Sequence, residues 1–313
     1  MRISFVNTLF EMAKNDKRIM LLTGDLGFSV FEQYIKELPK QYLNVGVAEQ
    51  NMAGVAAGMA MEGKTPLIYS IVPFTTMRNF EQIRNDICYQ NLNVKIVGVG
   101  AGFSYGPYAH THHGLEDIGI LRTLANLIIL CPGDPIEVAL ATKAMLNHIG
   151  PVYLRLGRAG EPNIHKSIPS FKIGKGILIE DGKDITIIAT STLLKRAWEA
   201  ASLLKEKGLS IRLISMHTIK PLDTQIILES AGKTPAIFTL EEHSIIGGLG
   251  SAVSEVLAEN RSNVIFKRIG VPDRFTKVIG TQEYMRKANG LSTEQIVNTI
   301  LERLARDCQP FTK

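Results

Sequence analysis

The sequence of 313 residues has few cysteines, no run of like charges and no long apolar stretch. Its three cysteines, Cys88, Cys131 and Cys308, lack Cys-x-x-Cys spacing, which indicates a reducing compartment rather than a disulfide framework. The formal net charge is only +5 and no lysine–arginine run stands out, so nucleic-acid binding is not indicated. Because no apolar run reaches membrane-spanning length and the N-terminus lacks the features of a signal peptide, we expect a cytoplasmic protein without a membrane segment.

What the sequence does contain is an alternation of short apolar strands and helices, at a hydrophobic content of 45% that is ordinary for a globular protein. The alternation occurs twice and is interrupted at residues 159–175, which carry two prolines and no periodicity. We therefore predict an α/β protein with two doubly wound, mostly parallel sheets, each covered on both faces. The predicted domains are residues 1–160 and 176–313, and residues 161–175 form the linker.

The expected elements follow from apolar periodicity and from the turn residues between them. The expected strands are residues 19–23, 42–47, 65–72, 94–99, 127–131, 152–156, 185–189, 211–215, 236–240 and 264–268. The expected helices are residues 3–14, 49–61, 74–91, 118–124, 135–147, 193–207, 224–231, 249–259 and 293–307.

Residues 52–61 are apolar or small on every side, which predicts a buried helix. Gly54 and Gly58 lie one turn apart in it and suggest the close approach of another backbone or a ligand. Glu49, at the start of this helix, is the only charged residue between residues 41 and 61. A buried carboxylate needs a partner, a raised pKa or a role in a reaction. The plainer interpretation is an acid in a first helical turn, where the helix dipole favours it.

Four further segments follow predicted strands: the turn 24–27, the junction 73–80, the loop 106–114 and the strand end 153–158. In a doubly wound sheet, such segments converge on one rim. Taken singly, the aromatic residues of the junction are typical of a core, and the arginines of the strand end are typical of a solvated surface. His110, His112 and His113 have spacing that permits zinc or nickel, but no acidic or thiol ligand lies nearby, so we do not predict a metal site here.

Together these residues resemble the transketolase family. The resemblance covers essentially the whole chain and rests on four motifs in register, at residues 47–52 (VAEQNM), 111–114 (THHG), 153–155 (YLR) and 239–251 (TLEEHSIIGGLGS). In order and spacing they are similar to that family's pyrimidine-binding domain followed by its C-terminal domain. The resemblance therefore implies thiamine diphosphate as cofactor and transfer of a two-carbon ketol unit from a ketose phosphate to an aldose phosphate.

One family motif is missing. The sequence contains no Gly-Asp-Gly, which in the family holds the metal and the diphosphate, and Met1 leaves no room for the domain that carries it. The chain therefore resembles the C-terminal subunit of a split transketolase, active only with an N-terminal subunit that binds the diphosphate and Mg²⁺. The resemblance further implies self-association through the C-terminal domain, in a dimer of heterodimers.

The resemblance also assigns roles at the cofactor. Glu49 becomes the catalytic acid, because a buried carboxyl with a raised pKa can donate to N1′ of the thiamine pyrimidine. Phe74 is the residue expected to stack on that ring. The other residues expected to bind the cofactor are Asp25, Leu26, Arg78 and Phe80.

At the substrate, the resemblance assigns His112 to the reacting oxygens, where a proton can be exchanged at neutral pH. Arg155 and Arg158 are expected to clamp a distal phosphate. Two departures accompany this assignment. Tyr108 stands where the family has an aspartate that reads a ketose hydroxyl, and a glycine near Gly100 replaces a phosphate-binding histidine. A modified or unusual sugar is therefore conceivable.

Other functions remain open. The β subunit of a 2-oxoacid dehydrogenase E1 shares the two-domain plan, and a deoxyxylulose-phosphate synthase-like enzyme is a nearer variant. Both would use pyruvate or another 2-oxoacid. A non-catalytic scaffold paralogue is the alternative from another class. The segment Glu241–Gly250 looks catalytic because its glycines follow a strand, but we interpret His243 and these glycines as structural.

Overall fold

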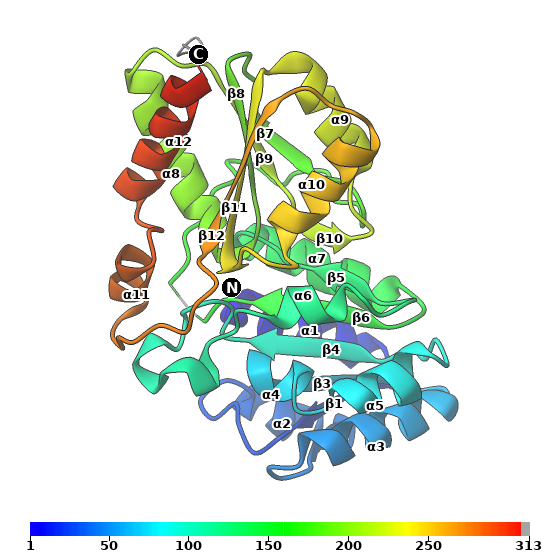
Figure 1. Cartoon of the computed structure of the whole chain (residues 1–313). Coiled ribbons are helices and arrows are strands. Elements are labelled where there is room, and N and C mark those ends of the chain that lie inside the picture. The colour runs from blue at the N-terminus through cyan, green and yellow to red at the C-terminus, as the bar shows by residue number, and fades with distance from the viewer. Residues whose placement is uncertain (159, 308–313) are drawn as a thin grey trace.

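The computed structural model describes residues 1–158 and 160–307, so Ala159, near the end of the first predicted domain, and Cys308 lie outside the described residues. Two sheets with flanking helices are stacked along the long axis of the molecule, with the N-terminal half at the bottom of Figure 1 and the C-terminal half at the top. The predicted α/β class with two mostly parallel sheets is confirmed. Among the helices of the described part, none is long and apolar enough to cross a membrane.

The first sheet has the strand order β10-β5-β6-β4-β3-β1-β2. Its strands are parallel except β10, which comes from the second half of the chain and pairs antiparallel with β5. The strands are β1 Ile19–Thr23, β2 Tyr42–Asn44, β3 Thr65–Ile71, β4 Lys95–Val99, β5 Ile128–Leu130, β6 Val152–Leu156 and β10 Thr218–Lys220. The helices of this half are α1 Arg2–Asn15, α2 Glu32–Glu37, α3 Glu49–Met61, α4 Val72–Thr76, α5 Phe80–Gln82, the π-helix η2 Ile83–Cys88, α6 Asp117–Leu121 and α7 Pro135–Asn147.

The second sheet has the order β12-β11-β8-β9-β7 and is parallel except for β7 at its edge. Its strands are β7 Ile177–Glu180, β8 Ile185–Ala189, β9 Ile211–Ser215, β11 Ala236–Ser244 and β12 Ile265–Val271. Its helices are α8 Leu194–Glu206, α9 Thr224–Lys233, α10 Leu249–Glu259, α11 Gln282–Ala288 and α12 Thr293–Asp307. Short 3-10 turns complete the chain at Pro39–Gln41, Gly106–Tyr108, His110–His112 and Ser191–Leu193.

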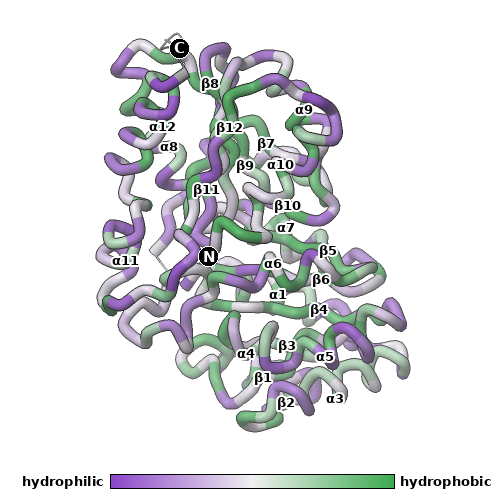
Figure 2. The backbone as a smooth tube through the Cα atoms, in the orientation of Figure 1, coloured by the Kyte–Doolittle hydropathy of each residue, from purple (hydrophilic) through white to green (hydrophobic). Residues whose placement is uncertain are grey.

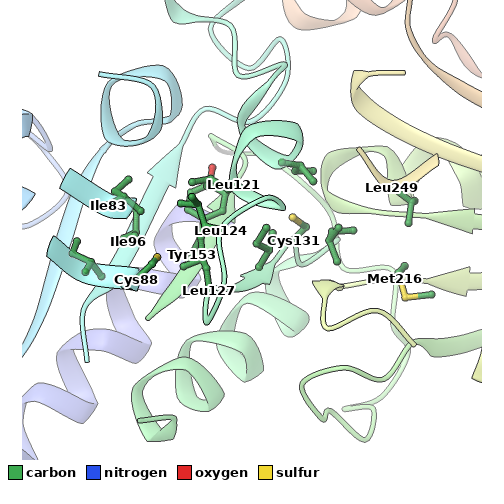
Figure 3. Close-up of a cluster of buried hydrophobic side chains, with 14 of the residues drawn as sticks. Ile83, Cys88, Ile96, Leu121, Leu124, Leu127, Cys131, Tyr153, Met216 and Leu249 are labelled. Carbon is green, nitrogen blue, oxygen red and sulfur yellow. The ribbon is translucent and has the colours of Figure 1, made fainter. Parts of the chain in front are cut away.

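Neighbouring residues on a strand serve different cores, because successive side chains point to opposite faces. Leu21 faces a core that α1 and α7 cover, whereas Leu22 faces a core that α3, η2 and α6 cover. The second of these cores continues from the first half into the second through Met216 and Leu249 (Figure 3). In Figure 2 the apolar colour likewise follows the strands through both halves. The two halves therefore share buried apolar surface as well as a strand.

Several details differ from the sequence predictions. The helix predicted at 74–91 is interrupted at residues 77–79, where Asn79 Nδ2 donates to the carbonyl of Glu49 at the start of α3 (3.4 Å). Helix α3 is also not buried on every side: Gly54, Gly58 and its last residue, Met61, are exposed. Elements that periodicity missed are β7, β10, α2 and α11, all short or at an edge.

Candidate active site

The carboxyl group of Glu49 lies at the centre of the candidate site. Glu49 is the first residue of α3 and only 2% exposed. Its Oε1 accepts a hydrogen bond from Ser70 Oγ (3.3 Å), at the end of β3, and its Oε2 pairs with Nη1 of Arg78 (2.8 Å). A Cβ atom on Gly24 would lie 3.5 Å from Oε1, so the backbone after β1 passes directly beside this carboxyl. Three strand ends thus meet at one buried acid.

The turn after β1 is held against the start of α3 by an asparagine. Asn44 Oδ1 accepts from the backbone N–H groups of Asp25 and Gly46 (both 3.0 Å), and its Nδ2 donates to Asp25 Oδ1 (3.1 Å). Asp25 has a φ of 55°, its side chain is exposed, and Leu26 is half-buried. The two residues predicted to line a cofactor pocket therefore lie near Glu49, on a turn with fixed geometry.

Phe74 and His112 continue the site from Arg78. The Arg78 guanidinium carbon lies 4.5 Å from the centroid of the Phe74 ring, and the His112 ring meets that ring edge-on at 5.1 Å. Phe74 is in α4, directly after β3, and His112 is in the loop after β4. The segments that follow β3 and β4 therefore meet at one rim of the sheet, as predicted. Phe80, by contrast, is half-buried and packs on the core behind α3.

His112 is arranged to stay neutral near pH 7. Burial lowers its pKa below 6.5, although a hydrogen bond with the Tyr108 backbone opposes this shift. Its Nδ1 lies 2.9 Å from Thr111 Oγ1, and the Tyr108 ring lies 5.2 Å away. A neutral imidazole both accepts and donates a proton, which suits a residue beside a reacting oxygen.

A cationic end of the site includes residues that the sequence reasoning missed. Arg158 is exposed after β6 and its guanidinium lies 5.3 Å from the ring centroid of Tyr105, which in turn contacts His112 at 6.4 Å. Burial raises the pKa of the Tyr105 and Tyr69 hydroxyls, and the nearby positive charge of Arg2 opposes this rise. The richness of the 100–114 loop in tyrosine was a usable signal for Tyr105, whereas nothing in the pattern around Arg2 singled it out.

Arg155 does not lie at this rim. It is fully buried, and its Nε pairs with Asp117 Oδ2 (2.8 Å). Its Nη1 donates to Ser191 Oγ (3.2 Å), and its Nη2 donates to the carbonyls of Gly114 (2.6 Å) and Glu242 (3.1 Å). The interpretation as a solvated arginine is wrong, and the geometry does not support the predicted phosphate contact, because the guanidinium is already bonded inside the protein.

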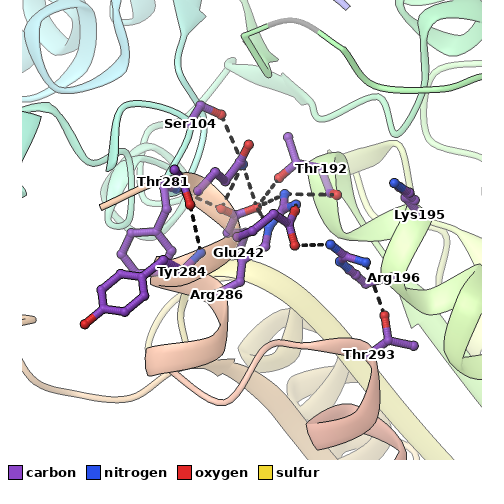
Figure 4. A network of polar contacts seen from close by, with 12 residues as sticks. Ser104, Thr192, Lys195, Arg196, Glu242, Thr281, Tyr284, Arg286 and Thr293 are labelled. Carbon is purple, nitrogen blue, oxygen red and sulfur yellow. Dashed lines mark hydrogen bonds and ion pairs between the residues drawn. The ribbon is translucent and has the colours of Figure 1, made fainter. Parts of the chain in front are cut away.

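A second buried network anchors the histidine loop to the C-terminal half (Figure 4). Glu242, on β11, is fully buried and accepts from the backbone N–H of Phe103 (2.8 Å) in that loop. Thr192 Oγ1 (2.6 Å), Gln282 Nε2 (3.0 Å) and Arg286 Nη2 (2.5 Å) donate to the same carboxylate. The second half thereby fixes the base of the loop that carries His112.

The glycine-rich motif of the second half surrounds a side chain of its own. Glu241 accepts from the backbone N–H groups of Leu249 (2.7 Å) and Gly250 (2.8 Å), and a Cβ atom on Gly248 would lie 1.9 Å from its Oε2. Burial raises the pKa of Glu241 to about 7. His243 is fully buried, burial lowers its pKa to about 4, and its Nδ1 donates to Ser244 O (2.7 Å). These contacts agree with the structural interpretation of the motif.

The remaining histidines of the loop differ in their surroundings. His113 is buried against Phe103, whereas His110 is exposed beside Phe275. Within residues 1–158 and 160–307, no group of three or more His, Cys, Asp or Glu side chains is placed to hold a metal ion. A pocket of about 580 Å³ lies elsewhere, near the segments that precede β4 and β5, and its lining includes Arg84, Cys88, Tyr89, Leu124 and Asn126.

Comparison with known proteins matches both halves of the chain. The family model of the transketolase pyrimidine-binding domain matches residues 1–161, and that of the transketolase C-terminal domain matches residues 174–296. An apulose-4-phosphate transketolase subunit of Phocaeicola vulgatus is 39% identical over 303 residues, 96% of this chain and 96% of that protein. The 6-deoxy-6-sulfo-D-fructose transketolase subunit SqwH of a Clostridium species is 38% identical over 303 residues, 96% of this chain and 94% of that protein. A solved structure described as a split gene transketolase, inactive beta4 tetramer, is similar with a TM-score of 0.89 and 36% identity, over 97% of this chain and 98% of that one.

Proposed function

The chain belongs to the transketolase family, and on this premise we propose that it is the C-terminal subunit of a split transketolase that depends on thiamine diphosphate. The reaction would move a two-carbon ketol unit from a ketose to an aldose. The observation that carries the proposal is the placement of Glu49 at the carboxyl ends of parallel strands. This nearly inaccessible acid is linked through Arg78 to the ring of Phe74, which the neutral His112 meets edge-on. The cytoplasmic location expected from the cysteine pattern belongs to this proposal.

The residues present suit the pyrimidine half of the cofactor. A flat, hydrogen-bonding ring requires a carboxyl group, an aromatic face and room beside them. Gly24 has no side chain, and a Cβ atom there would lie 3.5 Å from Oε1 of Glu49. Thiamine diphosphate supplies the carbanion chemistry when it is bound. Glu49 would then hold a proton at N1′ of the pyrimidine, and Phe74 would support the ring face. Asp25 and Leu26 would line the pocket beside Gly24.

The substrate would extend from His112 toward the cationic end of the site. His112, neutral near pH 7, would move a proton at the reacting oxygen. Arg158 and Arg2, grouped around Tyr105, would bind the anionic end of the sugar. The names of the two relatives, one with a phosphate and one with a sulfonated substrate, are consistent with an anionic end. Arg155 would not contact the substrate, and its ion pair would only hold the neighbouring segments in place.

A companion chain would complete the enzyme. The sequence has no Gly-Asp-Gly, and the described residues include no cluster fit for a metal ion, so we propose that an N-terminal subunit holds Mg²⁺ and the diphosphate. The exposed face of α3, with Gly54 and Gly58, would pack against that subunit, and the C-terminal domain would join two such pairs. Both relatives are named as subunits of a transketolase, and the similar structure is described as a tetramer, which favours this arrangement.

The test is an assay of the chain purified together with a companion chain that carries Gly-Asp-Gly. We expect ketol transfer from ketose phosphates to aldose phosphates, and its loss when thiamine diphosphate and Mg²⁺ are removed by dialysis with chelator. Use of pyruvate in place of a ketose would instead identify an E1-like or deoxyxylulose-phosphate synthase-like enzyme. Absence of any cofactor-dependent activity with the companion chain present would overturn the proposal in favour of a non-catalytic paralogue.

A further inference from the structure

Arg78 makes two contacts at once, with the acid and with the ring of the candidate site. Its Nη1 donates to Glu49 Oε2 at 2.8 Å, and its guanidinium carbon lies 4.5 Å from the centroid of the Phe74 ring. The Arg78 side chain is 44% exposed, whereas that of Glu49 is 2% exposed. The guanidinium therefore covers the solvent side of a buried carboxylate while resting against an aromatic ring.

These two contacts are the ones that an aminopyrimidine would need at the same place. A guanidinium is planar and delocalised, it donates from its edge to a carboxylate, and it stacks on aromatic faces. An aminopyrimidine that is hydrogen-bonded to this carboxyl through N1′ is likewise planar, bonds from its edge and stacks on aromatic faces. Ser70 Oγ bonds to Oε1 of Glu49 and Arg78 bonds to Oε2, so a pyrimidine that approaches Oε2 meets Arg78 there.

We propose that Arg78 is an intramolecular competitor of the cofactor pyrimidine, and that binding of the pyrimidine requires Arg78 to leave Oε2 of Glu49 and the ring of Phe74. This inference rests on the proposed function. The sequence predicts Arg78 as a residue that binds the cofactor, whereas this inference makes it a residue that the cofactor displaces.

The local structure allows such an exchange. Arg78 lies between the end of α4 at Thr76 and the start of α5 at Phe80, where regular helical hydrogen bonding is interrupted. Its backbone N–H bonds only to Pro73 O at a long 3.3 Å, and its neighbour Met77 is exposed. The side chain can therefore rotate into solvent without unfolding a helix. The adjacent Asn79 is buried and tied to Glu49, which keeps the rest of the segment in place.

Departure of Arg78 also has a chemical consequence for Glu49. A carboxylate that accepts a bond from a guanidinium has no proton to offer to a ring nitrogen. Donation to N1′ requires both a proton on the carboxyl and the loss of the ion pair. On departure of Arg78 the carboxylate would take up a proton from solvent, and this is the proton that Glu49 would then hold at N1′.

The first experiment measures the affinity of the complex with the companion chain for thiamine diphosphate with Mg²⁺, by isothermal titration calorimetry. Arg78→Met keeps the length of the side chain but removes the charge and the planar group, and we expect about ten-fold tighter binding. Arg78→Lys keeps a charge but loses the planar fork, and we expect an intermediate value. Arg84→Met is the matched control, an exposed arginine on η2, and we expect no change. Weaker or unchanged binding by Arg78→Met would overturn the inference.

The second experiment varies salt, because a half-exposed ion pair is screened by ions. The ratio of the dissociation constants of wild type and Arg78→Met should approach one as the salt concentration rises, whereas a ratio independent of salt contradicts the competition. The pyrimidine half alone, 4-amino-5-hydroxymethyl-2-methylpyrimidine, serves as a probe of the full chain by ligand-observed NMR. It should bind Arg78→Met more tightly than wild type, and this readout stands even where a variant assembles poorly.

The outcomes separate the two proposals. A complex that binds no thiamine diphosphate in any variant overturns the proposed function and this inference with it. A complex that binds the cofactor and transfers ketol units, but gains no affinity on removal of Arg78, overturns this inference alone.

Discussion

Arg155 and Asp117 form an ion pair of 2.8 Å in which neither side chain has any exposure to solvent. The pair lies where β6 and α6 meet the second half of the chain, because Arg155 also donates to Glu242 O and Ser191 Oγ. Tyr153 donates to the same Asp117 oxygen at 2.7 Å. Arg155, which the sequence predicts to bind a phosphate at the candidate site, thus joins the two halves of the chain.

The pair makes a clear prediction for stability. Asp117→Asn leaves the Arg155 charge buried without its carboxylate, and we expect a loss of about 3–5 kcal/mol in the free energy of unfolding. Urea denaturation followed by circular dichroism measures it. The control is Asp16→Asn, which breaks the exposed pair of the same length with Arg18 and should leave stability nearly unchanged. Equal effects of the two substitutions would contradict a structural role for the buried pair.

Periodicity alone predicted much of the fold. The bounds of β1, β6, β8, α7 and α10 agree with the expected ranges, because each is an apolar run or an amphipathic stretch between clear turn signals. β10 was missed because three residues carry no periodicity, and its pairing with β5 joins distant parts of the chain. The interruption at residues 77–79 coincides with the contacts of Arg78 and Asn79 with Glu49, which are tertiary contacts that no local pattern encodes.

Two residues of the candidate site could be picked out from the sequence, because each is a reactive residue type in an unusual position. Glu49 stood out as the single charge in an apolar stretch, and His112 through its motif. Arg155 and Arg158 could not be told apart, because two positions three residues apart on a strand end look alike in sequence. Arg155 lies within β6 and pairs with the buried Asp117, whereas Arg158 lies beyond the end of that strand and is exposed.

Arg158 should determine the affinity for the anionic end of the substrate. Arg158→Ala removes an exposed guanidinium beside Tyr105, and we expect KM for a phosphorylated ketose to rise about 10–100-fold with little change in kcat. Steady-state kinetics with the companion chain measures this effect, with the dephosphorylated ketose as the comparison substrate. An equal rise for both ketoses would show that Arg158 does not read the anion.

Glu49 should be required for the reaction and dispensable for the fold. Glu49→Gln keeps the shape of the side chain and an oxygen for Arg78, but it cannot give a proton to a ring nitrogen, so we expect ketol transfer to fall at least about 100-fold. Circular dichroism and co-purification with the companion chain verify that the variant folds and assembles. Glu62→Gln, at the exposed C-terminal end of α3, is the control. Near-full activity of Glu49→Gln would refute the assignment.

The linker is fastened by a buried histidine–glutamate pair. His165 Nε2 lies 2.7 Å from Oε1 of Glu137, whose Oε2 accepts from Gly133 N (2.6 Å). Burial alone would lower the pKa of His165, but the hydrogen bond and charge of Glu137, with Asp134, raise it above 6.5. Burial alone would raise the pKa of Glu137, but the bond from His165 and the nearby His217 hold it below 4.5. The pair is therefore charged on both sides near pH 6.

The pair predicts that the linker loosens as pH rises. A histidine with a raised folded pKa stabilises the protein fully below its unfolded pKa of about 6.5 and loses this contribution as pH rises through the folded value. Glu137, with a lowered pKa, contributes above about 4.5 and loses its contribution on acidification. We therefore expect amide hydrogen exchange at Ile164 and His165, corrected for intrinsic rates, to be slowest near pH 5–6 and to accelerate toward pH 8. His165→Gln should remove this pH dependence, whereas His110→Gln, in the exposed part of the loop after β4, should retain it. A profile that is flat in wild type would contradict the ion pair.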